Sequence, residues 1–234
     1  MARRETGAIG VEPVAAVSLS AIKDLAARHH LAVLGGFCCE DEVGLPAGTR
    51  SVLLLGPLEP GYWAHVKGQA EWLEYIVAGK TDPIDRWSRR VIGGMACDLG
   101  AKALFPFGGA PYHPFYQWAL RTGRVWDSPV RLLVQAEQGL MVSFRGALAM
   151  KQRVEVPVAV SPCEGCARPC LTACPVGALG ESGYDVPACR GYLSGPSGGD
   201  CLNFGCAVRR ACPVSQGYAR LAEHSAYHMG TFHT

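Results

Sequence analysis

Residues 163–175 read CEGCARPCLTACP, and this stretch decides how the last third of the chain is organised. The run that holds clusters in two-cluster ferredoxins is C-x2-C-x2-C-x3-C-P, and the stretch differs by one residue inserted before Cys170. A second, looser block supplies four more cysteines and ends in Pro213. Both blocks end on the same letters, ACPV, at 173–176 and 211–214, which indicates two halves of a pseudo-symmetric pair.

Two [4Fe–4S] clusters, and with them electron transfer, are what this pattern predicts. In ferredoxins the chain turns toward the other cluster after each Cys-Pro, so the fourth cysteine of a run binds to the neighbouring cluster. We therefore assign one cluster to Cys163, Cys166, Cys170 and Cys212. We assign the other cluster to Cys174, Cys189, Cys201 and Cys206. A pair of zinc sites is the alternative, but zinc favours two CxxC knuckles and has no need of a following proline.

Composition sets further limits on the class of protein. The chain has 234 residues and a formal charge of +2, without the basic balance expected of a nucleic-acid-binding surface. We expect no membrane span, because no apolar run is long enough to cross a bilayer. Arg3 and Arg4 are not followed by an uninterrupted apolar core, since Glu12 and Pro13 break it, so we expect a cytoplasmic protein without an export signal.

Residues 1–155 are expected to form an α/β or α+β sheet domain. Alternating apolar and turn-rich segments predict a helix capped by Ser18 or Ser20, and further helices over 62–78, from an Asp82 cap to Gly100, and over 114–122. Strands are predicted at 31–37, 51–58, 129–135 and 139–150. The remaining cysteines, Cys38, Cys39 and Cys97, are expected to be small core residues.

Residues 156–234 are expected to form a small two-cluster ferredoxin-like domain. This part is rich in Gly, Pro, Ser and Cys and poor in long periodic segments. Such a composition buries too little apolar area to fold unaided, so the clusters are expected to supply the missing stability.

The C-terminal part resembles the iron–sulfur module of epoxyqueuosine reductases. DVPACRGYLS (185–194) is similar to the family segment between its two cysteine blocks, and Gly205-Cys206 and Cys212-Pro213 stand in the later places. The spacing C-x4-C-x5-C from Cys201 to Cys212 departs from the family's tighter pattern.

The N-terminal part resembles the same reductases and the related cobalamin-processing chaperones. PAGTRSVLLLG (46–56) is similar to a strand of the reductases, and GLMVSFRGAL (139–148) to their Gly-rich segment. The resemblance implies a nitroreductase-like fold that holds cobalamin or flavin beside the clusters. Arg145 and Gly146 replace the Lys-Asn of the reductases, and no catalytic acid stands in a matching context. A net charge of +2 also gives no indication of the basic tRNA-binding surface expected of these reductases. We therefore reject epoxyqueuosine as the substrate.

Two groups of residues outside the cysteine blocks contain histidines that could bind a metal or a cofactor. The Gly- and aromatic-rich loop GGAPYHPFYQW contains His113 and Trp118, which are candidates for contact with a planar cofactor, with packing as the alternative. His224, His228 and His233 are expected to belong to a polar tail, because they lack acidic partners in sequence.

Three functions remain open. The leading one is an oxidoreductase in which two clusters pass electrons from a redox partner protein to a cofactor in the N-terminal domain. This cofactor is expected to be a corrinoid, or else FMN, and with a corrinoid the protein would be a cobalamin-dependent reductase. The second is a ferredoxin-type electron carrier without its own catalysis. The third is a cobalamin-binding or trafficking protein. Catalytic residues, substrate and electron donor are left unassigned.

Overall fold

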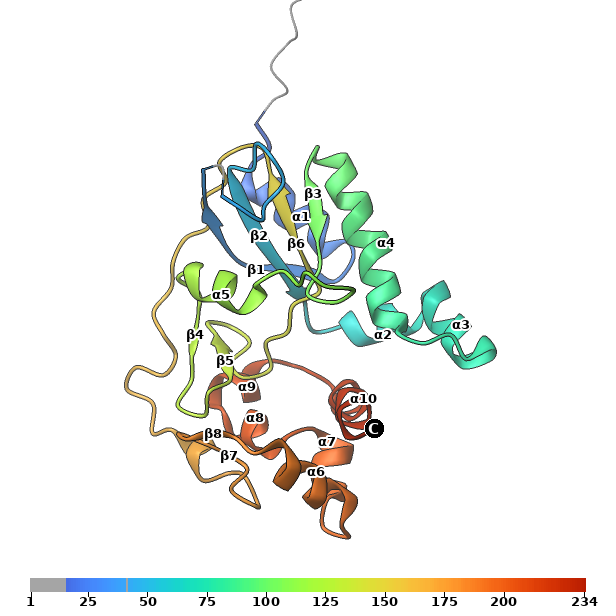
Figure 1. Ribbon diagram of the computed structural model, residues 1–234, viewed down its shortest axis with the longest axis vertical. Coiled ribbons are helices and arrows are strands. Elements are labelled where there is room, and N and C mark those ends of the chain that lie inside the picture. The colour runs from blue at the N-terminus through green and yellow to red at the C-terminus, as the bar shows by residue number, and fades with distance from the viewer. Residues whose placement is uncertain (1–15, 41) are drawn as a thin grey trace, which may run out of the picture.

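The computed structural model describes residues 16–40 and 42–234. It is a mixed α/β protein with small antiparallel sheets. Figure 1 shows a sheet with its helices in the upper part of the view and a group of short helices in the lower part. The expectation that the chain lacks an export signal concerns Arg3, Arg4, Glu12 and Pro13, which lie outside the described residues.

The main sheet has four strands in the order β1 (Leu31–Cys38), β2 (Ser51–Pro57), β6 (Gly146–Met150) and β3 (Lys102–Leu104). Every neighbouring pair is antiparallel. All of β2 is buried, which follows from its run of leucines without a charged residue. The strands predicted at 31–37 and 51–58 are thereby confirmed.

The two faces of this sheet pack into two separate cores. Leu53 and Leu55 join the first core, together with residues of α1 (Leu19–Ala27) and α4 (Pro83–Asp98). Val52 and Leu54 point to the other face and join the second core, which α5 (Phe115–Arg121) covers. The alternation is the period of two expected of a strand, and both faces are apolar because both are covered.

The helix predictions around this sheet are confirmed in position, with one wrong cap. The Ser18 side chain accepts a hydrogen bond from the backbone N–H of Ala21 at 3.1 Å, as a cap should. Asp82 has a left-handed φ of 54° and makes no capping bond with its side chain, so its predicted role is wrong although α4 begins at Pro83. The helix expected over 114–122 is α5.

The single helix expected over 62–78 is two helices, α2 (Tyr62–Lys67) and α3 (Ala70–Ala78). Gly68 ends α2, and Gln69 is extended, with φ −91° and ψ 158°. Glycine is costly inside a helix, which explains why the chain breaks here. The two helices also differ in burial, because Val66 in α2 is buried whereas Val77 in α3 is 76% exposed.

The strands expected at 129–135 and 139–150 are shorter than predicted. Only β5 (Leu133–Gln135) and β6 form, and β5 pairs with β4 (Val125–Asp127), which the sequence did not indicate. Gly139, with φ 57°, lies in the turn that follows β5 and forms an isolated bridge with Gln135. This turn carries the segment after β5 toward the C-terminal helices.

The C-terminal part consists of short elements packed around a third core. These elements are η1 (Pro169–Leu171), β7 (Leu179–Gly180), β8 (Gly183–Tyr184), α6 (Val186–Ser194), α7 (Gly199–Phe204), α8 (Ala207–Ala211), α9 (Pro213–Gly217) and α10 (Ala222–His233). The core contains Cys170 and Cys212 together with Val134, Leu140 and Val208. Since residues from both sides of position 155 share it, the N-terminal segment from β4 to Leu140 packs as part of the cysteine-rich half.

The final helix corrects the expectation of a polar tail. His224 lies in α10 and is 1% exposed, with its ring stacked on Trp63 at 4.8 Å between centroids. Tyr227, one turn further, packs against the first core. Helix α10 thus returns the chain to α2 and α3. Within residues 16–40 and 42–234, none of the helices combines the length and apolar character of a membrane span.

Candidate functional site

The first cysteine ring consists of Cys163, Cys166, Cys170 and Cys212, whose side chains line one small cavity. Cys212 is brought to the other three because Pro213 starts α9 directly after it. The opposite wall comes from the N-terminal half and includes Val134 and Leu140. The backbone N–H of Arg168 donates to Cys166 Sγ at 3.3 Å, as backbone amides do to the sulfurs of iron–sulfur sites.

The second cysteine ring consists of Cys174, Cys189, Cys201 and Cys206 around another cavity. Helix α6, which carries Cys189, is capped by Asp185, whose carboxylate accepts a hydrogen bond from the backbone N–H of Ala188 at 2.9 Å. The backbone N–H of Ala178 donates to Cys174 Sγ at 3.2 Å. The two rings are the same sets of four into which the ferredoxin pattern divides the cysteines; that they hold clusters stays a prediction.

The four cysteines of each ring line a small cavity. Among the described residues, no group of three or more His, Cys, Asp or Glu side chains could hold a single metal ion. A [4Fe–4S] cube binds each of its four thiolates to a different iron atom, so its ligands must be spread around the cube. The all-cysteine donor sets, their arrangement around a gap and the N–H donors to sulfur therefore fit two such groups.

Burial raises the pKa of the Cys163 thiol, and the charges of Cys166, Cys170 and Cys212 raise it further. Burial also raises the pKa of Cys201. Crowded, desolvated thiols of this kind keep their protons unless a cation offsets the charge of the thiolates. Binding of iron would supply that positive charge, with release of protons.

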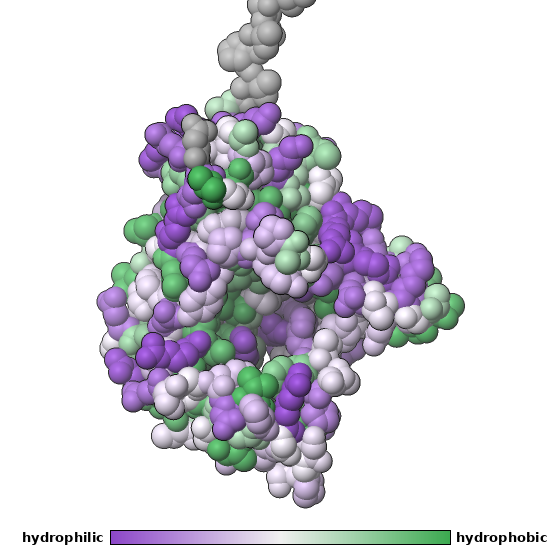
Figure 2. All heavy atoms as spheres, viewed as in Figure 1, coloured by the Kyte–Doolittle hydropathy of each residue, from purple (hydrophilic) through white to green (hydrophobic). Residues whose placement is uncertain are grey.

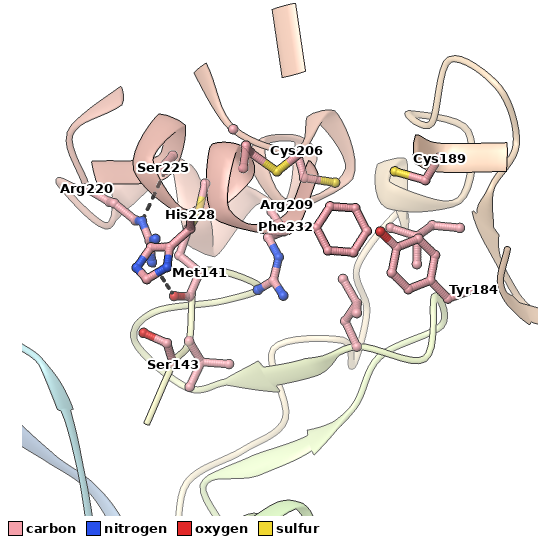
Figure 3. A pocket seen from close by; sticks show the side chains of 15 residues that line it. Met141, Ser143, Tyr184, Cys189, Cys206, Arg209, Arg220, Ser225, His228 and Phe232 are labelled. Atoms are coloured by element: carbon pink, nitrogen blue, oxygen red, sulfur yellow. Dashed lines mark hydrogen bonds between the residues drawn. The ribbon is translucent and has the colours of Figure 1, made fainter. Parts of the chain in front are cut away.

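A larger cavity of about 270 Å³ adjoins the second cysteine ring. Cys189 and Cys206 line both this cavity and the space inside the ring. Figure 2 shows the molecular surface hollowed between the sheet and the C-terminal helices. In Figure 3, Cys189 and Tyr184 stand on one side of the cavity and His228 and Arg220 on the other.

Two guanidinium groups, those of Arg209 and Arg220, belong to the polar part of the cavity wall. Arg220 Nε donates to Ser225 Oγ, and Arg220 Nη1 to the carbonyl oxygen of Met141, both at 3.1 Å (Figure 3). Arg209 Nη1 donates to the carbonyl oxygen of Leu140. Both arginines line the cavity, and burial lowers the pKa of Arg220 to about 10.

A row of buried side chains leads from the sheet to this cavity. Glu59 Oε1 lies 3.4 Å from His224 Nδ1, and His224 Nε2 lies 3.2 Å from His228 Nε2. Burial raises the pKa of Glu59 and lowers that of His224 to about 2, so the His224 imidazole is neutral at neutral pH. A neutral imidazole donates from one ring nitrogen and accepts at the other, so His224 can form hydrogen bonds to Glu59 and to His228 at the same time. Such a row can pass a proton to the cavity wall.

His113 and Trp118, the residues expected to contact a cofactor, lie elsewhere. Their rings stack on each other at 5.4 Å between centroids. Trp118 is 3% exposed and belongs to the second core, and neither residue lines the cavity beside the second ring. Of the three other cysteines, Cys39 is buried as expected, Cys38 is half-buried, and Cys97 is exposed, so the core expectation is wrong for Cys97.

Sequence reasoning missed most of the cavity wall. Arg209 stands between Cys206 and Cys212, two of the predicted cluster ligands, and a charged residue in such a position is a sequence signal that could have indicated the cavity wall. Arg220 and Tyr184 carry no comparable signal, because only the packing of α10 and β8 brings them to the cavity. No protein-family model, curated protein or solved structure matches the chain.

Proposed function

We propose that this protein is an iron–sulfur oxidoreductase, with a [4Fe–4S] cluster in each cysteine ring and an electron acceptor in the cavity beside the second ring. The observation that carries the proposal is that Cys189 and Cys206 belong both to the second ring and to the cavity wall. When bound, such clusters exchange single electrons over a range of potentials from roughly −700 to +450 mV.

The residues of the chain have separable tasks in this proposal. The cysteine thiolates bind iron, and the backbone N–H groups of Arg168 and Ala178 stabilise the charge on sulfur. The first ring is the proposed entry for electrons from a redox partner protein, because Cys163 also lines an open surface hollow with Arg131 and Arg168. Glu59, His224 and His228 hold a proton at the cavity wall, where a reduced acceptor would need one.

The size of the cavity bears on which acceptor is bound. Pockets for drug-sized ligands span roughly 300–1,000 Å³. About 270 Å³ is below that range, so the enclosed space does not fit a whole corrin ring and favours an acceptor smaller than cobalamin or FMN. A corrinoid- or FMN-dependent reductase is our second candidate, supported by the hollow next to the C-terminal helices (Figure 2) and by the family resemblance.

The nitroreductase-like and ferredoxin-like descriptions of the two halves also remain proposals. They are supported by the sheet with helices on both faces and by the crossed arrangement of the cysteine rings. An electron carrier without catalysis, or a cobalamin-trafficking protein, would share the rings but make different use of the cavity.

The first test is the metal content of anaerobically reconstituted protein. We expect about eight irons and as many sulfides per chain, since each cube contains four of each. Cys97→Ser is a matched control, because Cys97 is exposed and outside both rings. Zinc in place of iron, or iron at half the expected amount or less, contradicts the proposal.

The second test is a titration of the same protein with hydroxocobalamin and with FMN. Corrinoid or flavin bands that bind tightly and are reduced when the clusters are reduced would establish the second candidate. If neither binds, the acceptor is a smaller molecule or the protein is an electron carrier, and reduction of a small acceptor distinguishes these two outcomes.

A further inference from the structure

The arginines of the cavity differ from the other partly buried arginines in having no carboxylate partner. Arg145 pairs with Asp85, Arg124 with Glu137, and Arg210 with Asp200. Neither Arg209 nor Arg220 forms an ion pair with any carboxylate in the part of the chain that the structure describes. The two cavity arginines therefore carry positive charge that nothing in the described residues neutralises directly.

Most of their hydrogen-bonding capacity is also unused. A guanidinium has five N–H donors. Arg209 uses one of them, on the carbonyl oxygen of Leu140, and Arg220 uses two, on Ser225 and Met141. The remaining donors have no acceptor among the described residues, and both side chains line the cavity, so they are available to a molecule bound there.

The surrounding charges do not remove the need for an anion. The pKa of Arg220 is lowered by burial first and by the charge of Arg209 second, so the two cations repel each other in a buried setting. Glu59 acts on Arg220 from a distance but is placed against His224. The nearest carboxylate therefore forms no ion pair with Arg220.

The rest of the cavity wall is mainly apolar. Leu132, Met141, Leu179, Met229 and Phe232 contribute to it. A ligand that fits must therefore combine an apolar body with an anionic group, in a molecule small enough for about 270 Å³.

We propose that the cavity beside the second cysteine ring binds a small organic anion, with a carboxylate or phosphate group between Arg209 and Arg220 and an apolar body against Phe232 and Leu179. Planar, bidentate recognition of either group is what a guanidinium provides. The inference rests on the proposed function only in naming this anion as the electron acceptor; the binding site itself follows from charge and shape.

Binding to anaerobically reconstituted protein tests the site, by isothermal titration calorimetry with three probes of similar shape. Benzoate and phenyl phosphate carry the two anionic groups, and benzamide is the neutral control. We expect at least one anion to bind roughly tenfold or more tightly than benzamide, because a charge-assisted contact to a buried guanidinium contributes about 1.5–3 kcal/mol. The better of the two anions identifies the group.

Arg209→Gln and Arg220→Gln should each weaken binding of that anion by roughly tenfold or more, while binding of benzamide stays unchanged. Arg210→Gln is the matched control, because Arg210 lies beside Arg209 on α8 but pairs with Asp200. Iron content, measured for every variant, separates a lost site from a lost cluster.

The inference is overturned if benzamide binds as tightly as both anions, if neither anion binds, or if both arginine variants bind the anion like the wild type. Tight binding to a protein that never reduces any acceptor leaves the anion site standing and contradicts the oxidoreductase. If the protein reduces a neutral acceptor and neither arginine variant changes the rate, the oxidoreductase stands and the assignment of the anion as the electron acceptor is contradicted.

Discussion

The two cysteine rings each contain four thiols but have different surroundings. The first ring is closed on one side by residues of the N-terminal half, such as Val134 and Leu140, and reaches the surface near Cys163. The second ring lies among the C-terminal helices and opens, through Cys189 and Cys206, on a cavity with unpaired arginines. The difference teaches that two similar sets of cysteines can be given different surroundings by what packs around them, and the proposed function uses this difference to separate the entry of electrons from their exit.

The largest effect that tests this comparison is the loss of one ring at a time. Cys212→Ser should remove the cluster of the first ring, and Cys174→Ser that of the second, because each of these cysteines belongs to the ring remote from it in sequence. Each variant should keep about half of the eight irons expected. Iron assays and electron paramagnetic resonance of the reduced protein measure which cluster is left.

The reverse assignment gives the opposite result. If Cys174→Ser leaves the second ring's signal intact and removes that of the first, the crossed sets are wrong. Cys97→Ser, outside both rings, should keep all the iron.

Removal of both clusters should unfold one half of the molecule and spare the other. The third core is small and includes Cys170 and Cys212 among its buried members, so its stability depends on what the cysteines bind. Residues 156–234 and the segment from β4 to Leu140 should lose amide protection by several orders of magnitude, whereas β1, β2 and β6 should keep theirs.

Hydrogen exchange after anaerobic chelation checks this expectation. The segment from β4 to Leu140 is the discriminating one, because it belongs to the first half by sequence and to the third core by packing. Equal protection of both halves after cluster loss contradicts the dependence on clusters.

The sequence predicted what depends on local patterns. The cap at Ser18, the buried strands β1 and β2, and the helices α4 and α5 follow from spacing and from residues such as Pro83. The grouping of the cysteines around two cavities is the arrangement that motif spacing and the two Cys-Pro steps indicate.

What the sequence could not predict depends on long-range packing. His224 reads as part of a polar tail, yet it is buried because α10 returns to Trp63, more than 150 residues earlier in the chain. The apolar periodicity continues across Gly68 and therefore predicts one helix. The chain breaks there because a glycine inside a helix is costly, and the sequence pattern alone does not show which of the two effects is larger. The cavity is lined by residues of β8, α8, α10 and the segment after Gly139, so no single stretch of sequence predicts it.

Two glycines allow the rings to be perturbed separately without replacing a cysteine. A Cβ at Gly139 would lie 2.6 Å from the backbone N of Ser215 and 3.0 Å from Cys212 Sγ. A Cβ at Gly205 would lie 2.6 Å from Ser225 Cβ, next to the cavity. Both glycines have positive φ. Gly139→Ala should weaken the first ring and Gly205→Ala the second, each by about 1–3 kcal/mol.

Gly177→Ala is the matched control, since Gly177 also has positive φ but no atom within 4 Å of its added Cβ. It should cost only the backbone strain, about 1 kcal/mol. Thermal unfolding and the rate of iron loss measure the effects. Equal effects of all three substitutions would show that backbone strain, and not the approach to a ring, dominates.

The smallest effect concerns the pH dependence of stability on the side of the second ring. His224 has a pKa lowered to about 2, by burial first and then by the charges of Arg220 and Arg145, whereas an imidazole in the unfolded chain titrates near 6.5. Below pH 6.5 the unfolded chain therefore binds a proton that the native protein does not. Stability consequently falls as the pH drops through this window, by up to about 1.4 kcal/mol per pH unit for this one residue.

His224→Gln tests this contribution, because the titrations of groups that do not contact His224 largely cancel in the difference between the two proteins. The variant should be less stable at pH 7.5, since it loses the stacking on Trp63 and the hydrogen bond to His228. It lacks the imidazole that gains a proton on unfolding, so its deficit should shrink by about 1 kcal/mol between pH 6.5 and 5.5. Thermal unfolding midpoints of both anaerobic proteins at these three pH values measure the deficit. A deficit that stays constant or grows on acidification means that native His224 accepts a proton, which would contradict a neutral His224 in the folded protein.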